Sequence, residues 1–119
     1  MKVIFIDDDK NIYNSVSNIF ILKNSTPEYF SINQQFDNLK NIDGSESLLV
    51  FLKYGEKTAE IIKNLKNGSK NIKFVPFAES VDKEKIDLLI TLGISGFIKY
   101  KNIKDFSLKL KKYMDNIDT

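Results

Sequence analysis

The sequence predicts an α/β fold in which one parallel sheet of five strands is covered by helices on both faces. Short apolar runs rich in β-branched residues alternate along the chain with segments whose apolar residues recur at helical spacing. Strands that alternate with helices form parallel sheets, because each helix carries the chain back to the start of the next strand. The 119 residues suffice for one buried core, so we expect a single domain over residues 1–119.

The first half of the chain is expected to form two strands and two helices. Residues 2–6 are an apolar run that predicts the first strand. Helical spacing covers residues 11–23, and the proline-containing segment 24–27 interrupts it. Weak alternation predicts a second strand at residues 29–36, and residues 37–42 suit one short helix.

The second half continues the alternation. Five apolar residues in a row at 48–52 are typical of a strand that is buried on both faces. The pair Asn67-Gly68 indicates the end of a helix. The expected elements are a strand at residues 48–52, a helix at 59–65, a strand at 72–78, a helix at 81–93, a strand at 96–100 and a helix at 103–117.

The composition excludes several kinds of active site. The chain contains no Cys, His, Arg or Trp, so it has no disulfide, thiolate nucleophile, Ser-His pair or imidazole metal ligand. Any chemistry must use carboxylates, lysines, hydroxyls or the backbone. No segment approaches the length of a membrane span, so we expect a cytoplasmic protein that does not contact the membrane. The lysines are concentrated in the second half, and we interpret most of them as a solvated coat rather than a nucleic-acid site.

Three successive aspartates, Asp7, Asp8 and Asp9, follow the first strand. The functional crevice of a parallel sheet lies at the carboxyl ends of its strands, so this cluster is the first candidate site. Neighbouring carboxylates raise one another's pKa unless a cation or a hydrogen-bond donor compensates them. Mg²⁺, which takes oxygen ligands, and a lysine side chain are both suitable cations. The alternative is an exposed acidic turn in which one aspartate caps the next helix.

Two segments resemble the receiver domain of bacterial response regulators, the CheY-like family. The motif VIFIDDDKNI resembles the family's first strand, acidic pair and first helix, and LGISGFIKYKN resembles its junction between the fourth helix and the fifth strand. The order of the expected strands and helices supports both motif matches, and the resemblance extends over nearly the whole chain. The resemblance implies a flavodoxin-like (βα)5 three-layer sandwich with strand order 2-1-3-4-5 and a role in two-component, phosphorelay signal transduction.

The resemblance also implies roles for individual positions. In the family, an aspartate that ends the third strand accepts a phosphoryl group from a histidine kinase, and Mg²⁺ is bound by the acidic pair. A Ser or Thr that ends the fourth strand and a Lys that ends the fifth strand bind the phosphoryl group, while an aromatic residue in the fifth strand reorients. The acidic pair falls on Asp7 and Asp8, which could hold Mg²⁺, and the aromatic residue falls on Phe97.

The sequence departs from the family at the positions that handle the phosphoryl group. The acceptor position falls on Lys53, or on Leu52 if the register slips by one residue, and neither can accept a phosphoryl group in the family's way. The hydroxyl position falls on Ala78, although Ser80 lies two residues further on. The lysine position falls on Tyr100, with Lys99 and Lys101 on either side. The loop after the third strand is shorter than the family's. Pro76 lies in what the family's order makes a central strand, where we expect a bulge.

These departures predict a degenerate receiver, or pseudo-receiver, that acts by protein–protein interaction without phosphorylation at Lys53. We hypothesise that the Lys53 ammonium lies between Asp7 and Asp8 in place of Mg²⁺, so that no cofactor is required. The alternative is that Lys53 extends into solvent. Tyr100 suits either the core or an interface.

The expected partners are a histidine kinase or a downstream signalling protein. A second copy of the chain could bind through the family's helix 4–strand 5–helix 5 face, which corresponds here to residues 81–93, 96–100 and 103–117. The interface candidates on that face are Tyr100, Lys101 and Lys104.

An enzyme is the competing hypothesis. Asp7 and Asp9 also resemble the DxDx(T/V) motif of haloacid-dehalogenase-type phosphotransferases, which use Mg²⁺. Asn11 stands where that motif has Thr or Val, and no later acidic pair follows a buried strand, so we do not expect an enzyme. A flavodoxin-like cofactor binder is disfavoured, because no Gly/Ser/Thr-rich phosphate loop follows the first strand.

Overall fold

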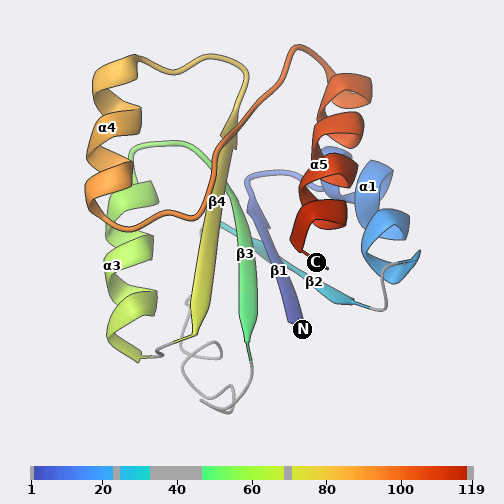
Figure 1. Ribbon diagram of the computed structural model, residues 1–119, viewed down its shortest axis with the longest axis horizontal. Helices are drawn as coiled ribbons and strands as arrows, with labels where there is room; N and C mark the ends of the chain where they lie inside the picture. The colour runs from blue at the N-terminus through green and yellow to red at the C-terminus, as the bar shows by residue number, and fades with distance from the viewer. Residues whose placement is uncertain (1, 23–24, 33–46, 69–70, 118–119) are drawn as a thin grey trace.

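Five parallel strands form one sheet in the order β2-β1-β3-β4-β5 (Figure 1). The computed structural model describes residues 2–22, 25–32, 47–68 and 71–117. The strands are β1 (Lys2–Asp7), β2 (Thr26–Ser31), β3 (Leu48–Lys53), β4 (Ile72–Ala78) and β5 (Ile98–Lys99). The helices are α1 (Asn11–Leu22), α3 (Thr58–Gly68), α4 (Lys83–Thr91) and α5 (Ile103–Ile117). The predicted fold class and strand order are therefore confirmed.

The helices form two layers, with α1 and α5 on one face of the sheet and α3 and α4 on the other (Figure 1). Strand β1 is buried on both faces, and its alternate residues divide between the layers. Val3 and Phe5 join the cluster under α1 and α5, whereas Ile4 and Ile6 join the cluster under α3 and α4. The near-continuous apolar run in β1 reflects this double coverage.

Helical spacing of apolar residues explains how α1 and α5 pack on the sheet. Helix α1 buries Ile12, Val16 and Phe20, which recur at intervals of four residues. Helix α5 buries Phe106, Leu110 and Met114 at the same interval. Each set lies on one side of its helix and contacts the same cluster of phenylalanines on the sheet. No helix among the described residues is long and apolar enough to cross a membrane.

Three expected boundaries differ from the structure. Strand β2 begins at Thr26 and ends at Ser31, whereas the sequence predicts a strand at residues 29–36. Pro27, read as part of a break, lies inside β2, where it is tolerated because β2 is an edge strand. Strand β5 is limited to Ile98–Lys99, and α4 begins at Lys83. The short helix predicted at residues 37–42 lies outside the described residues.

Pro76 causes no bulge, so that expectation is wrong. The pairing of β3 with β4 is uninterrupted, and Leu52 lies opposite Pro76. The carbonyl oxygens of Phe74 and Ala78 accept hydrogen bonds on the β5 side of β4. Pro76 lies two residues from each of them, and every second residue of a strand directs its N–H and C=O to the same neighbour. The missing N–H of Pro76 therefore also faces the β5 side. Strand β5 pairs with β4 only from Phe77 onward, and the missing donor therefore removes no bond of that ladder.

Candidate functional site

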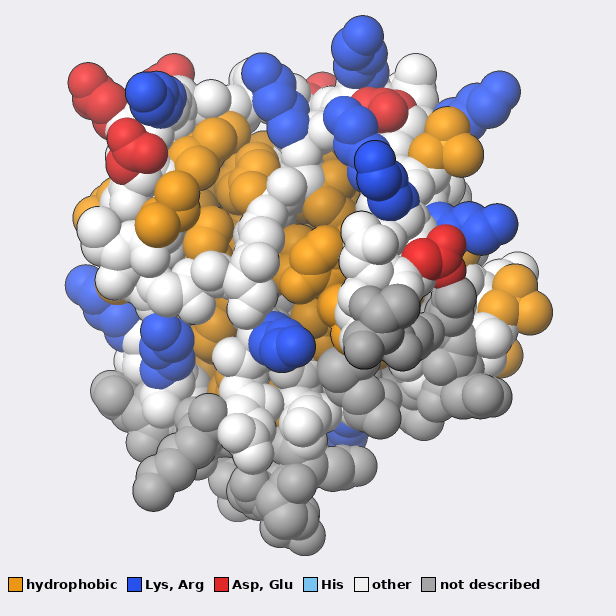
Figure 2. Space-filling view, in the orientation of Figure 1, with side chains coloured by type: hydrophobic (Ala, Val, Ile, Leu, Met, Phe, Trp, Pro, Cys, Tyr) orange, Lys and Arg blue, Asp and Glu red, His pale blue; other side chains and the backbone are white. Residues whose placement is uncertain are grey.

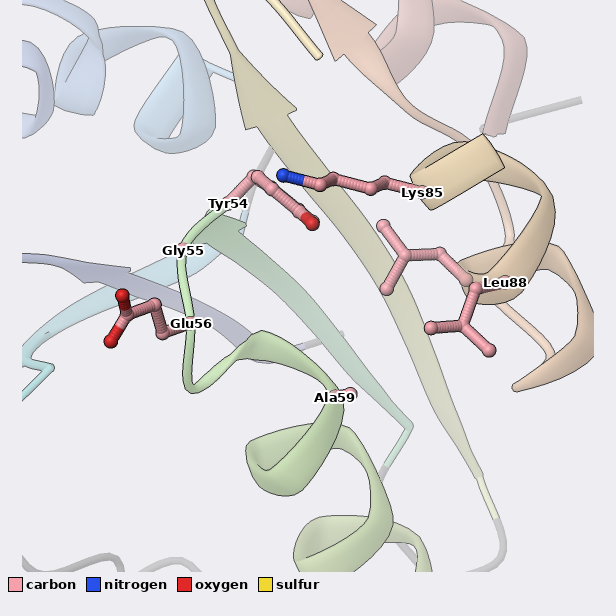
Figure 3. Close-up of a pocket in the computed structure, with 7 residues that line it drawn as sticks. Tyr54, Gly55, Glu56, Ala59, Lys85 and Leu88 are labelled. Carbon is pink, nitrogen blue, oxygen red and sulfur yellow. The ribbon is translucent and has the colours of Figure 1, made fainter. Parts of the chain in front are cut away.

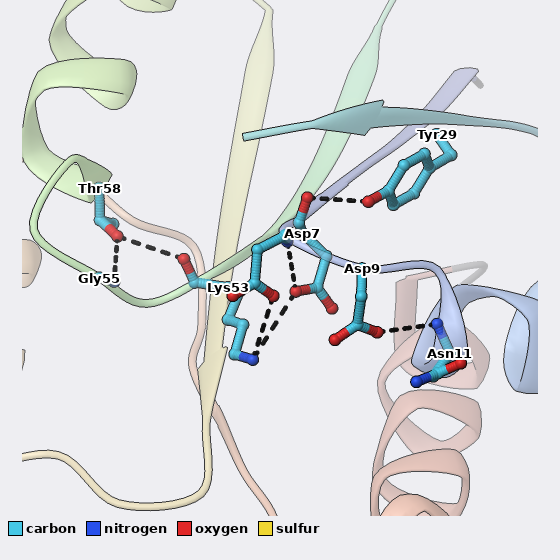
Figure 4. Close-up of polar contacts among 8 residues, drawn as sticks. Asp7, Asp9, Asn11, Tyr29, Lys53, Gly55 and Thr58 are labelled. Atoms are coloured by element: carbon cyan, nitrogen blue, oxygen red, sulfur yellow. Dashed lines mark hydrogen bonds and ion pairs between the residues drawn. The ribbon is translucent and has the colours of Figure 1, made fainter. Parts of the chain in front are cut away.

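The candidate site lies where β1 and β3 end side by side. Asp7 is the last residue of β1, Lys53 is the last residue of β3, and the two strands are directly paired up to Ile6 and Leu52. Leu52 is fully buried in the cluster under α3 and α4. Lys53 points the other way along the pleat, and Figure 4 shows its side chain extending toward the aspartates. Lys53, not Leu52, is therefore the strand-end residue that reaches the acids.

Asp7 is a fully buried carboxyl group with an incomplete set of hydrogen bonds. Its Oδ1 accepts a hydrogen bond of 2.7 Å from the backbone N–H of Asp8. Its Oδ2 has no hydrogen-bond partner in the described part of the chain. Burial raises the pKa of Asp7 from its ordinary value of 3.8 to about 7, and the neighbouring Asp8 carboxyl contributes to the increase. The strand end therefore carries a carboxyl group that is costly to ionise.

The Lys53 ammonium lies between the first two acids. Its Nζ is 3.3 Å from Asp8 Oδ1 and 3.8 Å from Asp7 Oδ1. Burial lowers the pKa of Lys53, but attraction to Asp7 and the hydrogen bond to Asp8 outweigh burial and leave the pKa above its ordinary value. Interaction with the Asp7 carboxyl, followed by attraction to Lys53, holds the pKa of Asp8 below its ordinary value. The sequence left open whether Lys53 contacts the aspartates or extends into solvent, and in the structure it contacts the aspartates.

Hydrogen bonds hold the backbone around both charges. The carbonyl oxygen of Asp7 accepts hydrogen bonds from the Tyr29 hydroxyl at 2.9 Å and from the N–H of Ile32 at 3.0 Å. The carbonyl oxygen of Lys53 accepts one of 3.4 Å from the hydroxyl of Thr58, whose Oγ1 accepts one of 2.8 Å from the N–H of Gly55 (Figure 4). Sequence reasoning missed Thr58. The signal was a threonine directly before a segment of helical spacing, which is typical of a helix start.

Asp9 contributes to the cluster but also stabilises the start of α1. Its Oδ1 accepts a hydrogen bond of 2.9 Å from the N–H of Asn11, the first residue of that helix. This contact matches the reading in which one aspartate caps the next helix. One carboxylate oxygen from each of Asp7, Asp8 and Asp9 lies within 4.8 Å of the others. The cluster therefore has the oxygen ligands for a divalent cation, with Lys53 already in contact with two of its members.

At the ends of β4 and β5, Ala78 and Tyr100 stand where the resemblance implies a hydroxyl residue and a lysine. Ala78 is buried and has no hydroxyl. The ring of Tyr100 is 4% exposed, with its centroid 6.2 Å from that of Phe77 and 5.1 Å from that of Phe106. Phe97 is half-buried against the cluster under α3 and α4. The sequence suited Tyr100 to either the core or an interface, and in the structure its side chain packs in the core.

Two hollows open near these strand ends. One of about 600 Å³ is bordered by Asp9, Lys53, Tyr100, Lys101 and Lys104, among other residues. Lys101 and Lys104 are exposed there, and their role in an interface stays a prediction.

The other hollow, of about 530 Å³, lies between the loop after β3 and helix α4. Figure 3 shows Leu88 of α4 pointing toward the space above Ala59 of α3. Glu56 and Lys85 also line it, but Lys53 and the acids do not, so it is separate from the acidic cluster.

Several solved structures with the same fold are response regulators or their receiver domains. A response regulator from Thermotoga maritima matches with a TM-score of 0.73 at 20% identity, covering 96% of this chain and 97% of that chain. A receiver domain from Rhodospirillum rubrum matches with a TM-score of 0.74 at 15% identity, covering 99% and 94% of the two chains. No protein-family model and no curated protein matches the chain. The resemblance to the receiver fold is thus confirmed.

One further match is an atypical orphan response regulator, which is described as having a phosphorylation-independent regulatory mechanism. Its TM-score is 0.71 at 14% identity, and the match covers 97% of this chain and 96% of that chain. The shared fold therefore includes a regulator described as independent of phosphorylation.

Proposed function

We propose that this chain is a receiver-like signalling domain that acts through contacts with other proteins and is not phosphorylated at the end of β3. The observation that carries the proposal is Lys53, which ends β3 beside the acidic pair. An ammonium group that is paired with carboxylates cannot take over the role of an acceptor carboxylate. The receiver fold and the loss of the acceptor together favour signalling by binding.

The opposite side of the site supports the same conclusion. Ala78 offers no hydroxyl, and Tyr100 places an aromatic ring in the core where the family has a lysine. At these two positions a phosphoryl group at the end of β3 would lack the Ser or Thr hydroxyl and the lysine ammonium that the receiver family provides. The phosphorylation-independent mechanism described for one structural neighbour is a precedent for such a domain.

The partner is proposed to be a protein, either a histidine kinase or a downstream signalling protein. Figure 2 shows lysine side chains gathered over α5, with apolar side chains in the middle of the same face. Lys101 and Lys104 are exposed at the start of this helix. A second copy bound through α4, β5 and α5 would use the same face, and sedimentation velocity over a range of protein concentrations tests for that homodimer.

Incubation with acetyl phosphate and Mg²⁺, followed by intact mass measurement, tests the proposal. We expect the native chain to keep its mass and Lys53→Asp to gain one phosphoryl group, because the substitution restores a carboxylate beside Asp7 and Asp8. Lys63→Asp, on the exposed side of α3, is the matched control and should gain none.

Two outcomes would count against the proposal. A phosphoryl group on the native chain would mean that another residue is the acceptor. Release of inorganic phosphate with turnover would instead support the phosphotransferase alternative that uses Asp7 and Asp9. The full burial of Asp7 disfavours that alternative, since a nucleophile must reach its substrate.

A further inference from the structure

We propose that the Lys53 ammonium occupies the cation position of the acidic cluster, so that this domain excludes the divalent metal its fold family implies. The inference deepens the proposed function and rests on it, because it concerns how the same site is held without a phosphoryl group. The residues present do not fit Mg²⁺ while Lys53 is in place. The cation that compensates the aspartates is therefore a side chain of the protein itself.

The first argument is geometric. Mg²⁺ requires near-octahedral oxygen ligands at about 2.0–2.1 Å. One oxygen of each carboxylate is already in contact with another group: Asp8 Oδ1 binds Lys53, and Asp7 Oδ1 accepts the N–H of Asp8 with Lys53 at 3.8 Å. Asp9 Oδ1 accepts the N–H of Asn11. A metal could bind the first two oxygens only if the ammonium moved away.

The second argument is that the backbone of Lys53 is held in place at the end of β3. Lys53 belongs to β3 and lies opposite Phe77 of β4. Its carbonyl oxygen is bound by Thr58, and the N–H of Tyr54 donates to the carbonyl oxygen of Phe77 at 2.8 Å. The charge is thus attached to a paired strand end, and only its own side chain has to be ordered at the site.

The third argument is the unpartnered oxygen of the cluster. Asp7 is fully buried, and its Oδ2 has no hydrogen-bond partner among the described residues. A buried carboxylate oxygen without a donor is a ready ligand for a cation. Removal of Lys53 should therefore turn a metal-excluding cluster into a metal-binding one, because the aspartates remain and the competing charge is lost.

Titration of the purified chain with MgCl₂ tests the inference, with binding measured by calorimetry and unfolding measured thermally in the same buffers. We expect the native protein to give no saturable heat and no change in Tm up to about 20 mM Mg²⁺. Lys53→Met removes the charge and keeps the length of the side chain. It should bind Mg²⁺ at least roughly tenfold more tightly than the native chain and gain several degrees in Tm.

Two controls and one replacement variant keep the inference falsifiable. Lys53→Arg keeps the positive charge and should behave like the native chain. Lys63→Met removes an exposed lysine from α3 and should change nothing. Lys53→Ala replaces Lys53→Met if that variant does not fold.

Saturable binding to the native chain with the affinity of the Met variant would overturn the inference, as would absence of binding in both the Met and Ala variants. Neither result affects the proposed function, which fails only if the native chain gains a phosphoryl group or turns over a phosphate substrate.

Discussion

The two halves of the sheet end differently, although all five strands run in the same direction. At the ends of β1 and β3, charged side chains meet, with the Lys53 ammonium 3.3 Å from Asp8 and 3.8 Å from Asp7. At the ends of β4 and β5, Ala78 and the Tyr100 ring belong to the buried part of the molecule. One half ends in a cluster of charges that compensate one another, and the other half ends in residues that belong to the buried core.

The difference separates two tasks that a receiver site combines. Holding an acidic pair requires only a nearby cation, and a lysine can provide it. In the receiver family a phosphoryl group is also bound by residues that end the fourth and fifth strands, and the corresponding positions here are Ala78 and Tyr100. The comparison predicts that substitutions in the second half affect stability most, whereas substitutions in the first half alter how stability responds to pH.

The largest effect is expected from Tyr100→Ala. The ring is 4% exposed and packs against Phe77 and Phe106, so its loss should lower the free energy of unfolding by about 3–5 kcal/mol. Urea denaturation monitored by circular dichroism measures the change. Lys101→Ala, at the exposed neighbouring position, should stay within about 0.5 kcal/mol. A loss of less than about 1 kcal/mol for Tyr100→Ala would show that the second half of the site is not core.

An intermediate effect, with a defined pH dependence, is expected from Asp7→Asn. The pKa of Asp7 rises from 3.8 in its ordinary state to about 7 in the fold. The folded protein thus holds this proton more tightly than the unfolded chain. The stabilisation is complete below about pH 4 and is lost as the pH rises through about 7.

At pH 8 the native chain carries the cost of a buried charge that the variant avoids, so Asp7→Asn should be more stable by about 2–4 kcal/mol. At pH 4 the two should be nearly equal. Urea denaturation at both values, with exposed Asp87→Asn as the control, measures the difference. Equal stability of Asp7→Asn and the native chain at pH 8 would contradict the prediction.

The smallest effect is expected from Thr58→Val. The hydroxyl of Thr58 joins Gly55 to the carbonyl oxygen of Lys53, and the side chain is buried. Its removal leaves the N–H of Gly55 without that acceptor and should cost about 1–2 kcal/mol. Thr58→Ser keeps the hydroxyl and should recover most of the stability. If Val and Ser behave alike in urea denaturation, the hydroxyl does not support the strand end.

The sequence predicted the central strands and the helices that pack on them, because their signals are local. The apolar run at residues 48–52 indicated a strand that is buried on both faces, and β3 is such a strand. Strand β2 was misplaced because Pro27 normally ends a segment, and its tolerance depends on β2 lying at the edge of the sheet. The effect of Pro76 likewise depends on the length of β5, which no local pattern reveals.

The candidate site was predicted to a similar extent. The aspartates were found from their position after a buried strand, and Lys53 was found because it stands where an aspartate was expected. Sequence reasoning left the direction of the Lys53 side chain open, since a lysine at a strand end can extend into solvent. It also left open whether Tyr100 faces a partner, because both answers suit an aromatic residue with a hydroxyl.

The two prolines have a consequence for how this chain meets other molecules. The N–H of Ile32 donates to the carbonyl oxygen of Asp7, so the even-numbered residues of β2 direct their backbone groups toward β1. Pro27 is odd-numbered, and its nitrogen therefore faces outward from the sheet. At the opposite edge, β5 is two residues long, and Lys99 lies exposed on it. Neither edge offers the unbroken row of donors and acceptors on which a foreign strand could add. Both sheet edges are thus poor templates for a foreign strand, which limits aggregation through the edges and leaves any contact with another protein to side chains.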